Sequence, residues 1–353
     1  MKNTTFAAIL LSFLILGAAP LPQYQVITAD PHHLEVLTPH LQTVSQVGRL
    51  WLATIKPSMP ANLMQHMRLV GSERVAHYRP NVRKSNRVDP AIQTLVSSVQ
   101  VSRIRADIEA LSNNYRTRRV GTDENRAAVT WVEQQLRAMG LVTRQICYRS
   151  GACSVIADKV GTAGSPDVVL IMAHIDSVGQ TFAGADDNAS GTAALLEMAR
   201  VLTTVEHTHS LRFFVTNGEE SNLLGAKHYA DELSRSGEIR KISMAINMDM
   251  VGYNSTNLVE LETNAPYDNL AREFAELAAS YTALTTKITL GAWGSDHVPF
   301  LDKGVAAILT IENWDTKTPC YHAACDKPDT INYNYAAEIT KLNVAAVASK
   351  AKD

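Results

Sequence analysis

The order of apolar and polar positions after about residue 100 predicts a chain of alternating helices and strands. Two stretches with helical spacing come first, at 104–111 and at 122–139, and the second ends at Gly140. Short apolar runs then alternate with further helical stretches. The predicted strands are 168–173, 211–216, 244–248, 258–262 and 305–311, and the predicted helices are 191–205, 224–233, 270–281 and 336–351. Strands that are apolar throughout and alternate with helices indicate a largely parallel sheet covered by helices on both faces.

The first 19 residues differ from this pattern. Lys2 precedes an apolar run at 6–16 and the small residues 17–19, an order typical of a secretory signal peptide. The run is too short to span a bilayer comfortably. We therefore expect export to a secreted or periplasmic location and a mature protein without a membrane anchor. Pro20 is unfavourable directly after a cleavage site, so retention of the segment as an anchor is the alternative.

Residues 20–88 show weak periodicity and end in a basic stretch. That stretch contains Arg79, Arg83, Lys84 and Arg87. Because exposed basic loops are readily cut, we expect 20–88 to be a propeptide or N-terminal extension, with a processing protease as a partner of this zymogen. A solvated charge run is the alternative. The catalytic domain would then be 89–353.

Composition and charge narrow the function only slightly. Hydrophobic residues make up 46% and charged residues 19% of the chain, an ordinary balance for a globular protein. A formal net charge of -2 gives no broad field to attract nucleic acid or an anionic membrane, so we expect neither as a partner.

The four cysteines fall into two close pairs, Cys147 with Cys153 and Cys320 with Cys325. Export permits disulfides, and we expect a local disulfide within each pair. Free buried thiols are the alternative. The spacing does not match that of zinc-finger ligands.

Polar side chains follow three of the predicted strands at the point where each strand ends. These residues are His174 and Asp176 after the first strand, Glu219 and Glu220 after the second, and Asp249 after the third. In open α/β sheets, ligand sites form outside the carboxyl ends of the strands, so we expect these groups to converge. Alternate residues of an extended chain share a side, so Asp176 can accept the second N–H of His174. Neighbours face opposite sides, which lets one glutamate bind metal while the other carries a proton.

Two loops supply further candidates. Asp186 and Asp187 precede the helix 191–205 and could simply cap its first turn. We expect instead that Asp186 bridges two cations roughly 3.5 to 4 Å apart, because a carboxylate has two oxygens to share. His322 lies between Cys320 and Cys325, and a disulfide there would help to present its imidazole as a last ligand.

Five separated motifs resemble, in order and spacing, the signature of bacterial secreted leucyl aminopeptidases of the co-catalytic zinc exopeptidase family. They are His174-Ile-Asp176, Gly184-Ala-Asp-Asp-Asn-Ala-Ser-Gly191, Glu219-Glu220, Asn247-Met-Asp249 and Ser295-Asp-His297, within a match over about 95–345. The resemblance implies an α/β three-layer sandwich of the zinc exopeptidase or phosphorylase-hydrolase-like type, with a mostly parallel central sheet and helices on both faces. It also implies two Zn²⁺ ions per chain, one on His174, Asp186 and Asp249 and one on Asp186, Glu220 and His322. Glu219 would be the general base, and Asp176 would lie behind the ligands.

One motif departs from the family pattern. In the related enzymes a tyrosine three positions before the Ser-Asp-His motif stabilises the oxyanion and a disulfide brackets it, whereas here Ala292 and Trp293 occupy this region with no cysteine nearby. The oxyanion donor could be Trp293 through its indole N–H, Tyr321 beside His322, or the metal alone, and these alternatives stay open. His297 is expected to be structural.

The resemblance implies a secreted metalloaminopeptidase that removes an apolar, leucine-like N-terminal residue from peptides. A hydroxide bound by both zinc ions would attack, with Glu219 as general base. A glutaminyl cyclase-like enzyme with a single zinc is the nearest alternative, and a noncatalytic binding protein on the same fold is another. The full ligand set argues against the first and the intact Glu219 against the second.

Overall fold

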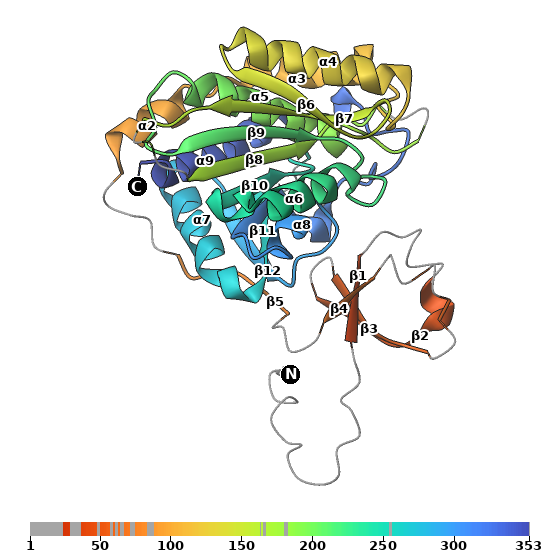
Figure 1. Ribbon diagram of the computed structural model, residues 1–353. Helices are drawn as coiled ribbons and strands as arrows, with labels where there is room; N and C mark the ends of the chain where they lie inside the picture. Colours follow the sequence, from red (N-terminus) through yellow and green to blue (C-terminus); the bar gives the residue numbers. More distant parts are fainter. Residues whose placement is uncertain are drawn as a thin grey trace.

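A nine-stranded mixed sheet forms the centre of the larger domain (Figure 1). The computed structural model describes residues 24–28, 37–47, 50–56, 59–60, 63, 67–70, 75–82, 88–162, 164, 167–179, 183–253 and 256–352. The strand order is β5-β12-β11-β13-β10-β8-β9-β7-β6. The strands are β5 (Ala76–Tyr78), β6 (Val142–Arg149), β7 (Ala152–Lys159), β8 (Val168–His174), β9 (Ser210–Thr216), β10 (Ile242–Met248), β11 (Leu258–Thr263), β12 (Thr285–Leu290) and β13 (Ala307–Glu312).

The central strands β13, β10, β8 and β9 are mutually parallel, and antiparallel pairs occur towards both edges. The predicted parallel arrangement is therefore found among the central strands, whereas the sheet is mixed towards its edges. β6 was not predicted because its side chains are mostly exposed and it has no continuous apolar run. β7, most of whose residues are buried, was also missed. β12 was missed because four of its six residues are Thr or Lys, and β5 because it is an edge strand of three residues.

Side chains of β8 alternate between two cores, one on each face of the sheet. Val169, Ile171 and Ala173 belong to the larger core, whereas Leu170 and Met172 belong to the smaller one. All seven residues of this strand are buried, which is why it reads as an unbroken apolar run.

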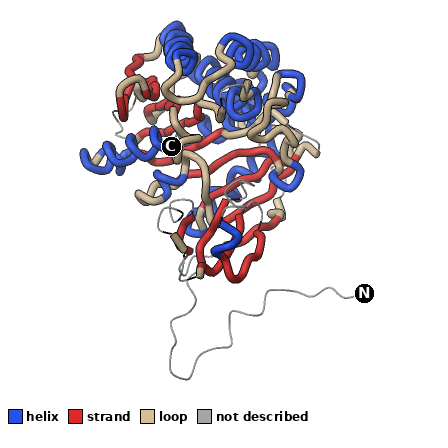
Figure 2. The backbone as a smooth tube through the Cα atoms, turned by 90° about the vertical axis from the view of Figure 1, so that its right-hand side faces the viewer, coloured by secondary structure: helices blue, strands red, loops and turns tan. Residues whose placement is uncertain are grey.

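Helices cover both faces (Figure 2). The helices are α2 (Pro90–Ser97), α3 (Val101–Asn114), α4 (Asp123–Ala138), α5 (Gly191–Leu202), α6 (Leu224–Ser236), α7 (Asp268–Tyr281), α8 (Val298–Leu301) and α9 (Tyr333–Lys350). α9 packs against α2, α3, α5 and α7 over the larger core, and α6 packs against α8 over the smaller one. The predicted three-layer α/β architecture is confirmed.

Local signals fix the helix ends that the sequence predicted. The Thr122 side chain accepts a hydrogen bond from the Asn125 amide at the start of α4, with Asp123 and Glu124 in the first turn. Gly140, with φ of 82°, follows the end of α4. Both disulfides are present as predicted: Cys147–Cys153 joins β6 to β7, and Cys320–Cys325 closes a short loop.

The N-terminal segment forms a separate four-stranded antiparallel sheet of order β2-β3-β1-β4. Its strands are β1 (Tyr24–Thr28), β2 (Leu41–Val47), β3 (Leu50–Ile55) and β4 (Met67–Val70). The chain then enters β5, which pairs with β12 of the central sheet. The predicted signal peptide at 1–19 and the basic residues Arg83, Lys84 and Arg87 lie outside the described residues.

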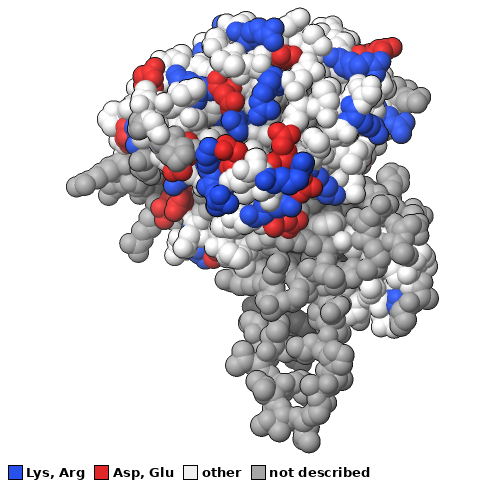
Figure 3. All heavy atoms as spheres, viewed as in Figure 1, with Lys and Arg blue, Asp and Glu red and all other residues white. Residues whose placement is uncertain are grey.

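Side chains of both charges are interspersed over the face of the larger domain seen in Figure 3, in keeping with the small net charge. Among the described residues, no helix has the length and apolar character needed to cross a membrane.

Candidate metal centre

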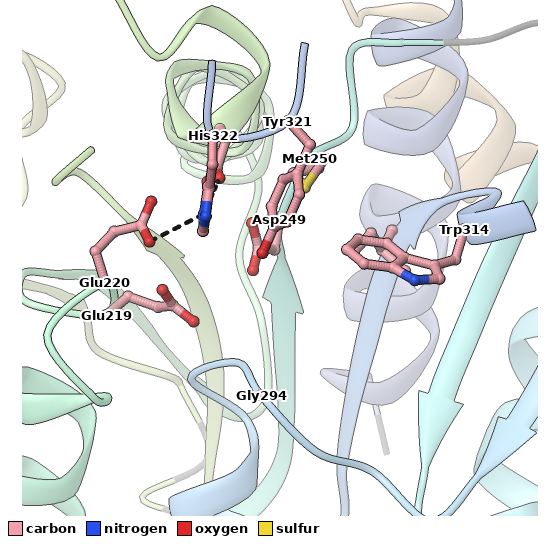
Figure 4. A pocket seen from close by; sticks show the side chains of 10 residues that line it. Glu219, Glu220, Asp249, Met250, Gly294, Trp314, Tyr321 and His322 are labelled. Atoms are coloured by element: carbon pink, nitrogen blue, oxygen red, sulfur yellow. Dashed lines mark ion pairs between the residues drawn. The ribbon is translucent and has the colours of Figure 1, made fainter. Parts of the chain in front are cut away.

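The predicted polar residues converge where β10, β8 and β9 lie side by side. His174 is the last residue of β8, Glu219 and Glu220 follow β9, and Asp249 follows β10. Because these three strands are parallel, their carboxyl ends lie at the same edge of the sheet. Two loops, carrying Asp187 and His322, complete the group. Figure 4 shows the glutamates on one side of His322, with Asp249 across from them.

Asp187 lies between the two histidines. Its Oδ1 is 3.3 Å from His174 Nε2, and its Oδ2 is 3.2 Å from His322 Nε2. His174 Nε2 is also 3.2 Å from Asp249 Oδ1, and His322 Nε2 is also 3.2 Å from Glu220 Oε2. The donors therefore form two sets that share Asp187, each with three side chains within 4.8 Å of one another.

The structure corrects the predicted bridging residue, since Asp187 and not Asp186 joins the two sets. The Asp186 side chain is fully buried on the other side of the loop, where its Oδ1 accepts a 2.7 Å hydrogen bond from the Gly252 amide. The backbone leaves helical geometry at Asp187 (φ -107°, ψ 88°), which separates the directions of the two neighbouring carboxylates. Capping falls to Asn188, whose Oδ1 accepts from the Gly191 amide at 2.8 Å. Sequence alone does not distinguish which of two adjacent aspartates faces the two histidines.

Asp176 holds the loop that carries the two glutamates. Its Oδ1 accepts from the amides of Gly218 at 2.7 Å and Glu219 at 3.1 Å, and its Oδ2 accepts from the Glu220 amide at 3.2 Å. His174 Nδ1 lies 3.0 Å from the Asp176 backbone oxygen and 3.7 Å from its carboxylate. The expected contact to His174 therefore runs mainly through the Asp176 carbonyl, while the carboxylate positions Glu219 and Glu220.

Sequence reasoning missed the partners of Asp249. Ser295 Oγ donates a 2.6 Å hydrogen bond to Asp249 Oδ2, and Asn247 Nδ2 donates to Ser295 Oγ at 2.7 Å. The Oδ1 atom is thus left facing His174. Membership of both residues in the family motifs was the signal that could have found them. His297 is fully buried 3.6 Å from Glu262 and belongs to none of the three clusters found among the described residues.

The charges of this cluster favour a bound cation. Burial and the neighbouring Asp187 carboxylate raise the pKa of Glu220 to about 7, and burial raises the pKa of Glu219 well above that of an ordinary glutamate. Burial alone would lower the pKa of His322, but the carboxylates of Glu220 and Asp187 outweigh it and raise this pKa to about 11. Glu220 Oε1 is buried without a hydrogen-bond partner. Divalent cations would relieve the repulsion between these carboxylates and replace the imidazole protons, so the donor set fits two metal ions.

The pocket over this cluster has one acidic side and one apolar side. The apolar side consists of Met250, Ile311, Trp314 and Tyr321. The Tyr321 ring stacks on the His322 imidazole with ring centroids 3.8 Å apart, and its other neighbour is Trp314 at 5.3 Å. Trp293 is not among the residues that line this pocket, and it is packed against the same hydrophobic cluster as Leu52 and Val75. Of the two side chains considered as oxyanion donors, only Tyr321 faces the cluster (Figure 4).

Residues 154–347, more than half of the chain, match the sequence model of Peptidase family M28. The chain belongs to this family. The match spans all the residues of the metal cluster.

Two relatives are similar in sequence to this M28 protein. Aminopeptidase YwaD of Bacillus subtilis is 36% identical over 194 residues, which are 53% of this chain and 42% of that protein. Leupeptin-inactivating enzyme 1 of Streptomyces exfoliatus is 31% identical over 261 residues, which are 66% of this chain and 58% of that protein. The matched region is therefore about half the length of these relatives.

Solved structures confirm the fold. The LapA aminopeptidase of Legionella pneumophila aligns with a TM-score of 0.71 at 17% identity and covers 95% of this chain and 100% of its own. A glutaminyl cyclase of Porphyromonas gingivalis aligns with a TM-score of 0.61 at 23% identity over 71% of this chain and 99% of its own. The longer alignment with LapA extends into the N-terminal segment before residue 89.

Substitution of the two adjacent aspartates separates their roles. Asp187→Asn is expected to weaken divalent-metal binding by at least about 10- to 100-fold, the range typical of losing a metal-site partner, because both sets lose the shared negative charge and the amide offers one oxygen in place of two. Asp186→Asn is the matched control, since burial raises the pKa of Asp186 to about 8 and an amide resembles the protonated acid. Calorimetric titration with metal measures both. A larger loss for Asp186→Asn would contradict this assignment.

Proposed function

We propose that this protein is a metalloaminopeptidase that hydrolyses the first peptide bond of peptides with two Zn²⁺ ions. The observation that carries the proposal is the sharing of the Asp187 carboxylate between His174 and His322. Each set then offers three nitrogen and oxygen ligands, which is the number that catalytic zinc sites use while keeping a position open. The names of the Bacillus subtilis relative and the Legionella pneumophila structure support the reaction.

The ligands in this proposal are His174, Asp187 and Asp249 at one position, and Asp187, Glu220 and His322 at the other. When bound there, the ions would lower the pKa of a water molecule from 15.7 to roughly 7 and polarise the substrate carbonyl. Asp176 and Ser295 orient the ligands from behind, as partners of metal ligands commonly do.

Glu219 is the proposed general base. One of its carboxylate oxygens lies within 4.8 Å of donor atoms of His174 and Glu220, and it belongs to neither of the sets that share Asp187. Glu219 accepts a proton from the attacking water, the new C–O bond forms, and the C–N bond breaks. Glu219 then returns the proton to the departing amine, so the carboxylate is regenerated.

Substrate selectivity would come from the apolar side of the pocket. Met250, Ile311 and Trp314 line the same pocket as Glu219, where they would contact a substrate whose scissile carbonyl is beside Glu219. They offer no charged partner, so burying an apolar N-terminal side chain would be favourable and burying a charged one would not. This supports a preference for leucine-like residues.

Tyr321 is the proposed oxyanion donor. Its ring stacks on the His322 imidazole, and its side chain lines the pocket. Trp293 is not among the residues that line the pocket and is therefore the weaker candidate. A hydroxyl aimed at the developing charge lowers the barrier because the dipole is already oriented before reaction.

We also propose that the chain is exported and that the N-terminal segment is removed or retained as an extension. The two disulfides support export, because such bonds persist in oxidising compartments. β5 is an edge strand of the central sheet, where it pairs with β12, and Arg79 directly follows it. Cleavage at the basic stretch would therefore break the covalent link between β5 and the catalytic domain that contains β12.

The glutaminyl cyclase-like alternative uses one metal. The second ligand set, with His322 and Glu220 sharing Asp187, favours the two-metal enzyme over it. A binding protein would not need Glu219 beside the ligands with a pKa raised by burial.

One assay on the purified full chain tests the class of reaction. We expect two zinc ions per chain and hydrolysis of leucyl anilide that an excess of chelator abolishes and added zinc restores. Glutaminyl peptides should be hydrolysed without cyclisation. One zinc with cyclised product would favour the cyclase, and metal binding without turnover of either substrate would favour a binding protein.

The Glu219→Gln variant tests the general base. Because Gln keeps the size of the side chain but cannot accept the proton, kcat should fall by about 10² to 10⁴. Zinc content should stay at the wild-type value, in contrast to a Glu220→Gln control, which should lose metal. Near-normal turnover of Glu219→Gln would refute the role.

The Tyr321→Phe variant tests the oxyanion donor. It retains the ring that stacks on His322, so metal content should be unchanged while kcat falls by about 10² to 10³, as for the loss of one oxyanion donor. Trp293→Phe is the control and should change kcat little. Steady-state kinetics on an apolar anilide measures both, and the opposite pattern would assign the role to Trp293.

A further inference from the structure

Asp326 holds the backbone of the bridging loop. Its Oδ1 accepts a 2.7 Å hydrogen bond from the Asp186 amide, and its Oδ2 accepts a 3.1 Å hydrogen bond from the Asp187 amide. Asp326 is only 2% exposed, so these bonds form without competition from bulk water. Because both oxygens of the carboxylate are hydrogen-bonded to the loop, Asp326 restrains the backbone at Asp186 and Asp187.

The same residue is attached to the loop that carries His322. It directly follows Cys325, whose disulfide to Cys320 closes that loop, and its own amide donates to the Ala323 carbonyl at 3.0 Å. Asp326 therefore connects two segments that are about 140 residues apart, one carrying Asp187 and the other His322. Asp187 Oδ2 and His322 Nε2, one from each of these segments, lie 3.2 Å apart.

Arg118 holds the preceding part of the bridging loop. Its buried guanidinium donates to the carbonyls of Ala183 at 2.7 Å and Gly184 at 2.7 Å. Burial lowers the pKa of Arg118 to about 10, and the charge of Asp326 is the largest effect opposing this. The positively charged Arg118 thus binds loop carbonyls, and the negatively charged Asp326 binds loop amides. Each charge is favourable for the backbone groups that it contacts.

A buried carboxylate so close to an acidic cluster is unfavourable unless hydrogen bonds compensate for the loss of hydration and for the repulsion. Asp326 lies near Asp187, whose charge raises its pKa after the larger effect of burial. An asparagine of the same shape would avoid this repulsion but could offer only one oxygen to two amide donors. Two acceptor oxygens are what the pair of amides requires.

We propose that Asp326 is a positioning residue that sets the bridging carboxylate and His322 for the second metal position. The inference rests on the proposed two-metal function and extends it. The position formed by Asp187, Glu220 and His322 has two ligands tied to Asp326, whereas the position formed by His174, Asp187 and Asp249 has only one. Loss of Asp326 therefore weakens the two positions unequally.

The test measures zinc release from the full-length Asp326→Asn protein to a chromogenic chelator. We expect one zinc per chain to bind about 10- to 100-fold more weakly and to leave first, while the other changes much less. Asp329→Asn is the matched control, because it removes the same charge three residues away at an exposed position. Thermal unfolding in chelator reports any loss of fold stability separately from metal affinity.

Asp326→Glu is measured alongside, because it keeps the charge but moves the oxygens by one methylene, and it should show the same unequal loss. Release of both ions at wild-type rates, or equal weakening of both, from the folded variants would overturn the inference while leaving the proposed function intact. Fewer than two zinc ions on the wild-type chain would instead overturn the two-metal function and this inference with it.

Discussion

The sharing of the Asp187 carboxylate between two imidazoles is the contact on which the site depends. Each oxygen faces one histidine, and the Nε2 atom of each histidine also lies 3.2 Å from one further carboxylate, so moving Asp187 would separate the two sets. Such a cluster cannot hold itself together, because its carboxylates repel one another in a buried setting. It persists because backbone amides and neighbouring side chains fix each carboxylate: Asp176 fixes the glutamate loop and Ser295 fixes Asp249.

The fold makes that arrangement possible by supplying three rigid strand ends side by side. β8 is buried on both faces, and its alternating side chains anchor it in two cores at once. His174 therefore ends a strand that is packed on both faces, whereas Asp187 and His322 come from loops. The loops need additional restraints, and they have them in the Cys320–Cys325 disulfide and the buried hydrogen bonds of Arg118.

The sequence predicted those parts of the fold and site that depend on periodic burial. β8, β9 and β10 were found because apolar runs end abruptly in polar residues, and this also located His174, Glu220 and Asp249. The predicted bridging residue was Asp186 and not Asp187 because both are acidic, adjacent and buried. Only the backbone turn at Asp187 distinguishes them. The prediction missed strand β6 for another reason. Its residues are mostly exposed, and its strand conformation depends on pairing with β7.

The departure from the family pattern at Ala292 and Trp293 has a structural counterpart elsewhere in the chain. Trp293 is packed against the same hydrophobic cluster as Leu52 and Val75, which come from the chain before residue 89. The pocket instead receives an aromatic ring from Tyr321, in the loop closed by the Cys320–Cys325 disulfide. In the proposed enzyme, this loop presents both the ligand His322 and the hydroxyl of Tyr321, whose ring stacks on the His322 imidazole. Under that proposal, the Cys320–Cys325 disulfide would restrain His322 and the Tyr321 hydroxyl together, and a tyrosine at position 292 would not be needed as the oxyanion donor.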